Sequence, residues 1–343
     1  MLYSDDIFFF GAGFSKSLIN SYPTLSELSN YFLDNGLINE NEKIYKDNLE
    51  QLLTYLITPL PFKTKEDILR DEASYIEKID KISDYFIELR GNTAIDGNDK
   101  NVLILSKYIN NNKCTCITLN YDLLLEEMLF LTKEYESYNV FYKIPIKSID
   151  ERIQTEGMGF NFYQSNFFNE INNSIEIIKL HGSINWHCDQ IYKNSQIYSH
   201  SGVKINKDSS LYNITPYKEK LFIDLKPLII PPILDKTNNY NHILLQSLWR
   251  KAFKAIRSAK NIYIYGFSFP MTDLSVVYLF QSALRLNKND YKIYVVNTES
   301  NIKNKKKRYN EIFGDDKCDF SFCCNDNLKK LAKHLNKKSP ESI

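Results

Sequence analysis

The sequence predicts an α/β fold, in which a Rossmann-like parallel sheet carries helices on both faces and contains an α-helical insertion. Two observations lead to this prediction. Four apolar segments, 7–15, 112–123, 175–186 and 262–273, each end in a cluster of small or polar residues, and amphipathic helical stretches separate them. Ligands bind at the carboxyl ends of strands in such sheets. We therefore expect the four strand ends to meet in one nucleotide pocket.

Length and composition are consistent with one large domain. The chain has 343 residues, of which 43% are hydrophobic and 14% aromatic, so it can bury a sizeable core. We expect residues 1–343 to form a single catalytic domain that contains the insertion. The net charge is +1, which gives no global field for nucleic acid or an anionic membrane. Nucleic acid is therefore not indicated as a partner.

The cysteines and the amino terminus bear on metal binding and location. The six cysteines form no Cys-x-x-Cys pair, so the usual pattern of a structural zinc site is missing and we expect no metal. Asp5 and Asp6 stand where a secretory signal would carry Lys or Arg, and no apolar run is long enough to span a membrane. A soluble, cytoplasmic protein is the expectation.

The first predicted strand leads directly into a glycine-rich turn. Residues 7–10 are apolar at consecutive positions, as expected of a strand covered on both faces, and Gly11-Ala12-Gly13-Phe14-Ser15 follows. Such a turn can approach a ligand closely and cradle a phosphate with its amide groups. The third glycine of the dehydrogenase fingerprint is replaced by Lys16. A plain turn between strand and helix therefore remains the alternative.

Residues 24–110 have the pattern of a helical insertion. Thr24 and Glu27 have capping-box spacing, and the helix that they start extends to Gly36. Further apolar stripes predict helices over about 41–58, 65–90 and 102–109. These stripes lack reactive groups, so we interpret them as core packing.

Two strands in the middle of the chain end in chemically useful residues. The run 114–118 breaks into Asn120, Tyr121 and Asp122, and the run 175–180 stops at His181-Gly182. A histidine at a strand end would face the same crevice as Asn120, whereas His187 and Cys188 are interpreted as structural. Residues 140–168 are mixed in character, and Gly157 and Gly159 suggest a loop there. Residues 189–220 resemble an exposed excursion or hairpin, and 228–233 can be an edge strand at best.

The second half of the chain repeats the pattern of an apolar strand followed by small or polar residues. An amphipathic helix over about 249–260 precedes a strand at 262–265, which is followed by Gly266-Phe267-Ser268 and then Asp273. The last clear strand, 291–296, ends in Asn297-Thr298-Glu299, where Glu299 could bind ribose hydroxyls or cap a helix. The basic run 303–308 is interpreted as a solvated face.

Together these motifs resemble the sirtuin family, in its prokaryotic sirtuin-like branch. Gly11-Ala12-Gly13-Phe14-Ser15 looks like the family's loop around the NAD phosphates, and Thr118-Leu119-Asn120-Tyr121-Asp122 looks like its Thr-Gln-Asn-Ile-Asp segment. Leu180-His181-Gly182 matches the segment with the family's catalytic histidine. The resemblance implies that Gly266, Ser268, Asp273, Asn297 and Glu299 hold the adenosine half of NAD+, while Asn120 and Asp122 serve the water or ribose and the nicotinamide amide.

Two departures from the family pattern refine this expectation. Sirtuin deacylases carry two Cys-x-x-Cys pairs after the histidine, where this chain has only Cys188, and Pro23-Thr24-Leu25-Ser26 replaces their Pro-Asp-Phe-Arg segment. With Tyr121 and the helical insertion, the chain is similar to zinc-less NADases of bacterial antiphage defence. That resemblance implies abortive infection through NAD+ depletion. It also implies a homo-oligomer or an assembly with a HerA-like ATPase or another neighbouring-gene product.

The expected function is therefore an NAD+ glycohydrolase that releases nicotinamide and ADP-ribose. His181 would act as general base and Asn120 would orient the water. An NAD-dependent protein deacylase or ADP-ribosyltransferase using the same pocket is one alternative. A non-catalytic module that senses NAD or another nucleotide is the other.

Overall fold

The described part of the chain builds a parallel sheet that carries the predicted strand ends along one edge. In this computed structural model, the structure describes residues 3–45, 48–133, 135, 138–149, 162–163, 175–189, 197–200, 225–234, 236, 240 and 242–339. Six strands form the main sheet: β1 (Asp6–Phe10), β2 (Thr115–Thr118), β5 (Glu176–Lys179), β9 (Asn261–Tyr265), β10 (Lys292–Val296) and β11 (Cys318–Asp319). Their order is β11-β10-β9-β1-β2-β5 and every pair is parallel. The α/β, Rossmann-like prediction is confirmed.

The strand order reverses beside β1, which is buried on both faces. Phe8 and Phe10 stack on one side of β1, and Phe8 also meets Tyr108 edge-on. Phe9 points to the other side, where its ring lies 5.1 Å from that of Phe280. Consecutive apolar residues are required here because both faces of the strand are covered. The switch between β1 and β9 is the place where such a sheet binds ligands.

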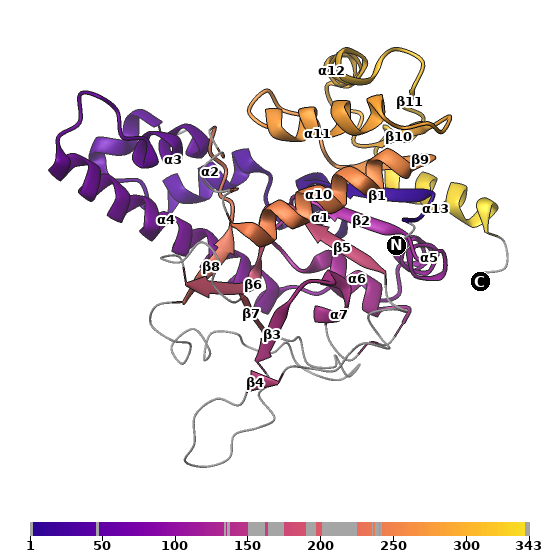
Figure 1. The fold of residues 1–343 in the computed structure, drawn as a ribbon, viewed down its shortest axis with the longest axis horizontal. Coiled ribbons are helices and arrows are strands. Elements are labelled where there is room, and N and C mark those ends of the chain that lie inside the picture. Colours follow the sequence, from indigo (N-terminus) through magenta and orange to yellow (C-terminus); the bar gives the residue numbers. More distant parts are fainter. Residues whose placement is uncertain are drawn as a thin grey trace.

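Helices cover both faces of the sheet (Figure 1). On the side of Phe8 and Phe10 lie α1 (Ala12–Leu18), α5 (Lys100–Asn111), α6 (Leu124–Phe130) and α13 (Asn327–Lys338). On the side of Phe9 lie α10 (Ile243–Ser258), α11 (Leu274–Arg285) and α12 (Ile302–Phe313). The helix predicted from 249 thus begins earlier, at Ile243, where the ring of His242 caps it.

A group of helices between β1 and β2 lies apart from α5, at the left of Figure 1. It consists of α2 (Leu25–Asp34), the 3-10 turn η1 (Glu40–Tyr45), α3 (Leu49–Ile57) and α4 (Lys65–Asn92). The capping box predicted at Thr24 and Glu27 is present. The single helix predicted over 41–58 is wrong, because Asn48 starts a new helix by accepting from the Gln51 amide. The boundaries 24–110 for an insertion stay a prediction, since α5 packs on α13 beside the sheet.

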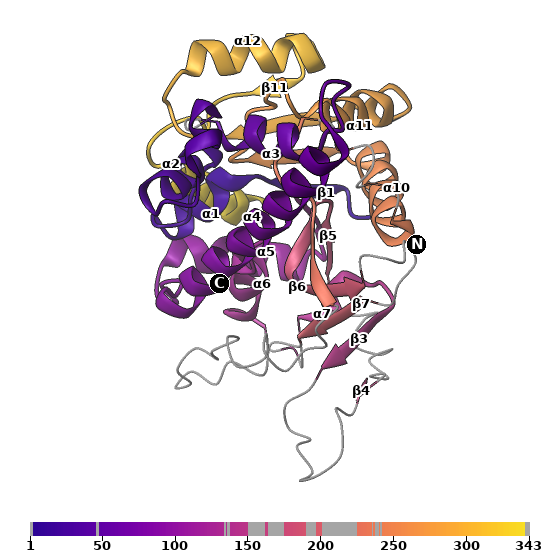
Figure 2. The same cartoon turned by 90° about the vertical axis from the view of Figure 1, so that its left-hand side faces the viewer.

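A second sheet was not predicted. It comprises β3 (Ile146–Ile149), β4 (Phe162–Tyr163), β6 (Gly182–Asp189), β7 (Ile197–His200) and β8 (Leu225–Ile229), in the order β4-β3-β7-β6-β8. Figures 1 and 2 show it on the side of the main sheet away from α12. An edge strand was expected at 228–233; the structure has an edge strand there, β8, which begins and ends earlier and shares only residues 228 and 229 with the predicted range. The short helix α7 (Asn139–Tyr142) precedes β3, and most of the predicted loop and excursion lies outside the described residues.

The sequence predicted that the strand 175–180 stops at His181-Gly182. In the structure, the chain continues at this point directly into a strand of the second sheet. Strand β6 begins at once, at Gly182, with φ at +77°. A Cβ at this position would lie 1.9 Å from the Leu228 carbonyl oxygen. Glycine is therefore needed where the chain passes from the main sheet to the second one, and this corner fixes the backbone of His181.

No helix among the described residues is long and apolar enough to cross a membrane.

Candidate functional site

One cavity of about 1020 Å³ lies along the carboxyl edge of the main sheet. It collects residues that follow β1, β2, β5, β9 and β10, which are five separate places in the sequence. The predicted site residues that line it are Gly11, Ala12, Gly13, Ser15, Asn120, Asp122, His181, Gly266, Ser268, Asp273 and Asn297. The structure thus brings the polar strand ends together, as the sequence led us to expect.

Two predicted site residues do not line this cavity. The Phe14 side chain is buried in the core, where its ring lies 4.3 Å from Phe10 and 5.3 Å from Tyr265. It faces the sheet because it occupies the inner side of α1. Glu299 is exposed, in the turn after β10 that leads into α12. Neither side chain is placed to contact a ligand in the cavity.

The glycine turn after β1 is joined to the turn after β9. The Gly11 amide donates to the Tyr265 carbonyl at 2.9 Å, and the Gly13 amide donates to the Gly266 carbonyl at 3.0 Å. Gly266 has φ +69°, and a Cβ there would lie 2.2 Å from the Phe14 nitrogen. Glycine is therefore required by the close approach of the two turns. The Gly13 amide is already used by this contact and is not free to cradle a phosphate.

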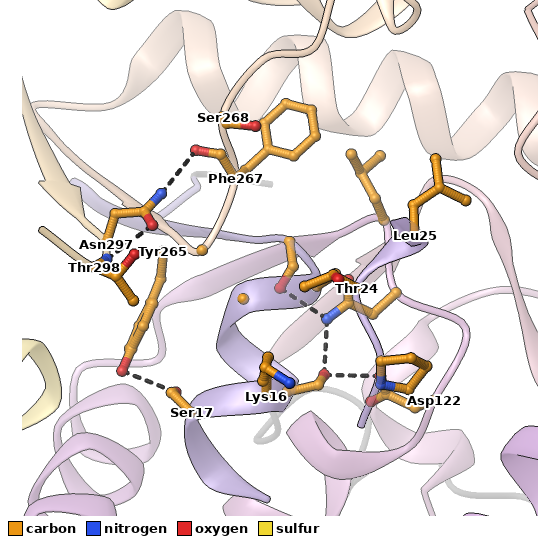
Figure 3. A pocket seen from close by; sticks show the side chains of 18 of the residues that line it. Lys16, Ser17, Thr24, Leu25, Asp122, Tyr265, Phe267, Ser268, Asn297 and Thr298 are labelled. Carbon is orange, nitrogen blue, oxygen red and sulfur yellow. Dashed lines mark hydrogen bonds between the residues drawn. The ribbon is translucent and has the colours of Figure 1, made fainter. Parts of the chain in front are cut away.

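A chain of hydrogen bonds links the turn after β1 to the residues after β2. Asn120 donates through Nδ2 to the Gly11 carbonyl at 3.0 Å and to Ser15 Oγ at 2.9 Å. Ser15 Oγ in turn donates to Asp122 Oδ2 at 2.7 Å, the bond that reaches Asp122 in Figure 3. Asn120 and Asp122 are therefore held in one arrangement by a buried hydroxyl that pairs with both.

This network fixes which way the Asn120 amide points. A carbonyl only accepts hydrogen bonds, so the nitrogen of Asn120 must face Gly11, and Oδ1 points away from that contact. No described residue donates to this Oδ1. The cavity therefore offers a pre-oriented amide oxygen that can accept a hydrogen bond from a water or a hydroxyl.

A buried ion pair between Lys179 and Glu126 lies beside the residues that follow β2. Lys179, on β5, donates to the Asp122 carbonyl at 2.5 Å and pairs with Glu126 at 2.9 Å. Asp122 also accepts from the Leu124 amide at 3.1 Å, at the start of α6. Burial raises the pKa of Asp122, while Lys179 and the Ser15 hydrogen bond oppose the shift. One carboxylate oxygen of Asp122 thus accepts from its own loop at Leu124, and the other accepts from Ser15 in the turn after β1.

His181 brings an imidazole into the same cavity. Its backbone carbonyl accepts from the Ile230 amide at 2.8 Å, and its side chain is only 5% exposed. Nε2 is buried and has no hydrogen-bond partner among the described residues. The pKa of His181 is lowered to about 3, mainly by burial and also by the Lys236 cation, while Asp273 opposes the shift. The ring is therefore neutral at ordinary pH and can accept a proton.

Charged residues that the sequence did not single out surround this end of the cavity. Lys236 is buried and forms an ion pair with Asp273 at the start of α11. Glu50, from α3, also lines the cavity, and burial raises its pKa against the opposing charge of Lys236. Lys236 follows a proline-interrupted segment, and Glu50 is one of many acidic residues in a helical stretch. Nothing in the sequence distinguished Lys236 or Glu50 from the charged residues expected on the protein surface.

The opposite end of the cavity is formed by the turn between β10 and α12. Asn297 donates to the Phe267 carbonyl at 3.4 Å, and Lys305 of α12 contacts both Asn297 and Thr298. Figure 3 shows Asn297 and Thr298 on the far side of α1 from Asp122. The cavity therefore extends from the His181 end, across the glycine turn, to the β10 end.

The match to a known family covers most of this structure. The family model described as SIR2-like domain matches residues 115–314. This chain belongs to the SIR2-like family. The match includes β2, β5, β9 and β10, and so contains Asn120, His181, Gly266 and Asn297, whereas the glycine turn after β1 lies before it.

Several solved structures are similar to this SIR2-like chain. One is described as a Sir2 homolog–NAD complex, with 15% identity, 98% of this chain and 91% of that chain covered, and a TM-score of 0.43. A Sir2 enzyme solved for its mechanism and regulation has 13% identity, covers 98% and 95% of the two chains and has a TM-score of 0.41. A sirtuin solved for substrate affinity has 14% identity, 97% and 93% coverage and a TM-score of 0.39. No curated protein matches the chain.

In the parts of the chain that the structure describes, no group of three His, Cys, Asp or Glu side chains is arranged to hold a metal ion. The groups that can act on a ligand here include the neutral imidazole of His181, the amide oxygen of Asn120 and the charged side chains of Lys236 and Asp273.

Proposed function

We propose that this SIR2-like protein is an NAD+ glycohydrolase, which cleaves NAD+ to nicotinamide and ADP-ribose. The observation that carries the proposal is the joint presence, in one cavity, of an unpartnered Nε2 of His181 and an unoccupied Oδ1 of Asn120. The cavity volume of about 1020 Å³ lies at the upper end of the usual range for ligand sites, so a dinucleotide fits. The sirtuin-like sequence motifs support NAD+ as the ligand.

The chemistry needs a base and a positioned water rather than an acid. Nicotinamide leaves a positively charged ring as a neutral molecule, so the bond between C1′ and the ring nitrogen breaks without a proton donor. Water forms the new bond to C1′ and loses one proton, which His181 Nε2 accepts. As this bond forms, the water oxygen becomes acidic, and even a weakly basic imidazole can take the proton. Asn120 Oδ1 accepts a hydrogen bond from the water or from a ribose hydroxyl and so fixes the attack geometry.

The glycine turn has a positional role in this mechanism. It lies between the two ends of the cavity, where the pyrophosphate of a dinucleotide would cross the switch point of the sheet. Asp122 holds its own loop and, through Ser15, the turn after β1. Its part in catalysis is therefore to keep Asn120 in place.

The biological role that we propose is depletion of cellular NAD+ in antiphage defence. It rests on the sequence resemblance to defence NADases. An enzyme of this kind must be silent until it is triggered, because continuous NAD+ loss would kill its host. We therefore propose that the protein acts as a homo-oligomer or with a defence partner, such as a HerA-like ATPase or another neighbouring-gene product.

Identification of the products tests this function against its alternatives. The full chain is incubated with NAD+, alone and with the neighbouring-gene product, and the products are identified by mass spectrometry. Nicotinamide together with free ADP-ribose is the expected result. O-acetyl-ADP-ribose or an ADP-ribosylated protein would instead assign transfer chemistry. NAD+ binding without any product, under every condition, would assign a sensing module.

A further inference from the structure

The wall of the cavity at its β10 end is built from a lysine and two hydroxyls. Lys305, in the first turn of α12, donates to Asn297 Oδ1 at 3.1 Å, to the Thr298 carbonyl at 3.0 Å and to Thr298 Oγ1 at 3.1 Å. Thr298 Oγ1 also lies 2.8 Å from Ser300 Oγ. Thr298, Ser300 and Lys305 all line the cavity. One ammonium and two hydroxyl groups are therefore gathered at a single place on the wall.

This lysine carries its charge without a carboxylate partner. None of the described acidic side chains forms an ion pair with Lys305, including Asp326, which lines the same end of the cavity. Glu299, which the sequence suggested as a ligand of ribose hydroxyls, is exposed and does not line the cavity. Partial burial lowers the pKa of Lys305. An anion at this wall would pair with a cation that is now satisfied only by neutral acceptors.

The proposed reaction determines what part of a dinucleotide reaches this wall. With the scissile bond beside His181 and the pyrophosphate at the glycine turn, the adenosine half extends over the ends of β9 and β10. In dinucleotide sites, an acidic residue favours a free ribose 2′-hydroxyl, whereas a basic residue accommodates a 2′-phosphate. Here Glu299, the acidic residue that follows β10, lies outside the cavity, whereas Lys305 lies in its wall; Asp326 lines the same end but forms no ion pair with Lys305.

We propose that Lys305, Thr298 and Ser300 form a subsite for the 2′-phosphate of the adenosine ribose, so that the protein takes NADP+ in preference to NAD+. This inference rests on the proposed function and names its substrate class. The phosphate oxygens accept from the ammonium and the two hydroxyls, which replaces part of the contact with neutral acceptors by charge-assisted hydrogen bonds. Cleavage then proceeds as for NAD+, with water as co-substrate, and releases nicotinamide and 2′-phospho-ADP-ribose.

The first test measures binding alone. Adenosine 2′,5′-bisphosphate and 5′-AMP, which differ only in the 2′-phosphate, are titrated into the full chain by calorimetry at one fixed ionic strength. We expect the bisphosphate to bind about tenfold tighter or more, as for one charge-assisted contact. Lys305→Met should bring the ratio of the two affinities close to one. Lys307→Met, which removes an exposed charge from the same helix, should leave the ratio unchanged.

Further variants separate the subsite from a general effect on the fold. Lys305→Arg keeps the charge and should retain most of the preference, and Ser300→Ala should reduce it by a smaller factor than Lys305→Met does. Equal affinities in the parent, failure of the bisphosphate to bind, or an unchanged ratio in Lys305→Met would overturn the inference.

The second test compares kcat/KM for NADP+ and NAD+ in the active form of the protein. We expect a higher value for NADP+ than for NAD+ in the parent, and a ratio close to one in Lys305→Met. If NAD+ is cleaved and NADP+ is not, this inference fails while the proposed function stands. If neither is cleaved but the bisphosphate preference depends on Lys305, the proposed function fails and the subsite stands.

Discussion

Ser15 determines the geometry of the site at the scale of single residues, because its hydroxyl joins Asn120 to Asp122. Removing this hydroxyl leaves buried polar groups with one partner fewer. We expect Ser15→Ala to lower the free energy of unfolding by about 1–3 kcal/mol and to reduce turnover, because Asn120 loses a fixed orientation. Urea denaturation measures the first effect. Ser26→Ala, an exposed serine on α2, is the control and should change stability by less than about 0.5 kcal/mol. Equal stability of the two variants would contradict this role of Ser15.

Burial is the main cause of the low pKa of His181, and the Lys236 cation lowers this pKa further. His181 must be neutral to accept a proton, and its pKa of about 3 lies well below its usual 6.5. The acid limb of kcat/KM should therefore be absent between pH 5 and pH 8. In Lys236→Met the nearby cation is lost and Asp273 loses its partner, so the pKa of His181 should rise above about 3 and the acid limb of kcat/KM should move to higher pH, although burial still lowers this pKa. Lys254→Met, on the exposed side of α10, should leave the acid limb where it is in the parent. An acid limb at the same pH in Lys236→Met and in the parent would show that this lysine does not lower the pKa of His181.

At the scale of residues, the sequence predicted those cavity residues that are polar and follow a strand. Asn120, Asp122 and His181 could be identified because each directly follows an apolar run, and parallel strands bring such positions to one edge. Phe14 was placed in the site by its position in the glycine motif, although its side chain faces the core. Lys236 and Lys305 could not be found, because their positions depend on how distant segments pack against the cavity.

At the scale of elements, the joined turns after β1 and β9 predict unequal effects of two similar glycine substitutions. Gly266 and Gly36 both have positive φ, at +69° and +66°. At Gly36 an added Cβ meets nothing within 4 Å, so Gly36→Ala should cost only about 1 kcal/mol of backbone strain. At Gly266 the same Cβ would lie 2.2 Å from the Phe14 nitrogen, and either the β1 turn or the β9 turn must shift. We expect Gly266→Ala to cost at least about 3 kcal/mol more, or to prevent folding. Thermal unfolding of both variants checks this, and similar midpoints would mean that the two turns are not packed as described.

Elements with strong local signals were predicted well, and elements that pair over long distances were not. The apolar run of β1 and the capping box of α2 are local sequence features, and both are present in the structure. The second sheet was missed because all its strands except β6 have five residues or fewer, and because they pair over long distances. One signal was available: Ile184, Trp186 and Cys188 alternate with polar residues along β6, as in a strand.

At the scale of the whole molecule, the order of strands determines where chemistry can occur. Residues 11, 120, 181, 266 and 297 are far apart along the chain, and they share one cavity because the sheet places β9 beside β1 and β5 beside β2. The repeated strand-end pattern predicted this convergence. It could not predict that the helical group between β1 and β2 contributes Glu50 and Phe86 to the same cavity, since that depends on tertiary packing.

The central claim is that His181 and Asn120 act together on the bond between ribose and nicotinamide. Release of nicotinamide from NAD+ or NADP+ by the active assembly tests it most directly, in the parent, His181→Ala and Asn120→Ala, with each variant shown to be folded by circular dichroism. Loss of a positioned general base typically costs about 10²–10⁴-fold. We predict a decrease of this size for His181→Ala and a comparable one for Asn120→Ala, with nucleotide binding largely retained. A folded His181→Ala protein that releases nicotinamide at the rate of the parent would contradict the account.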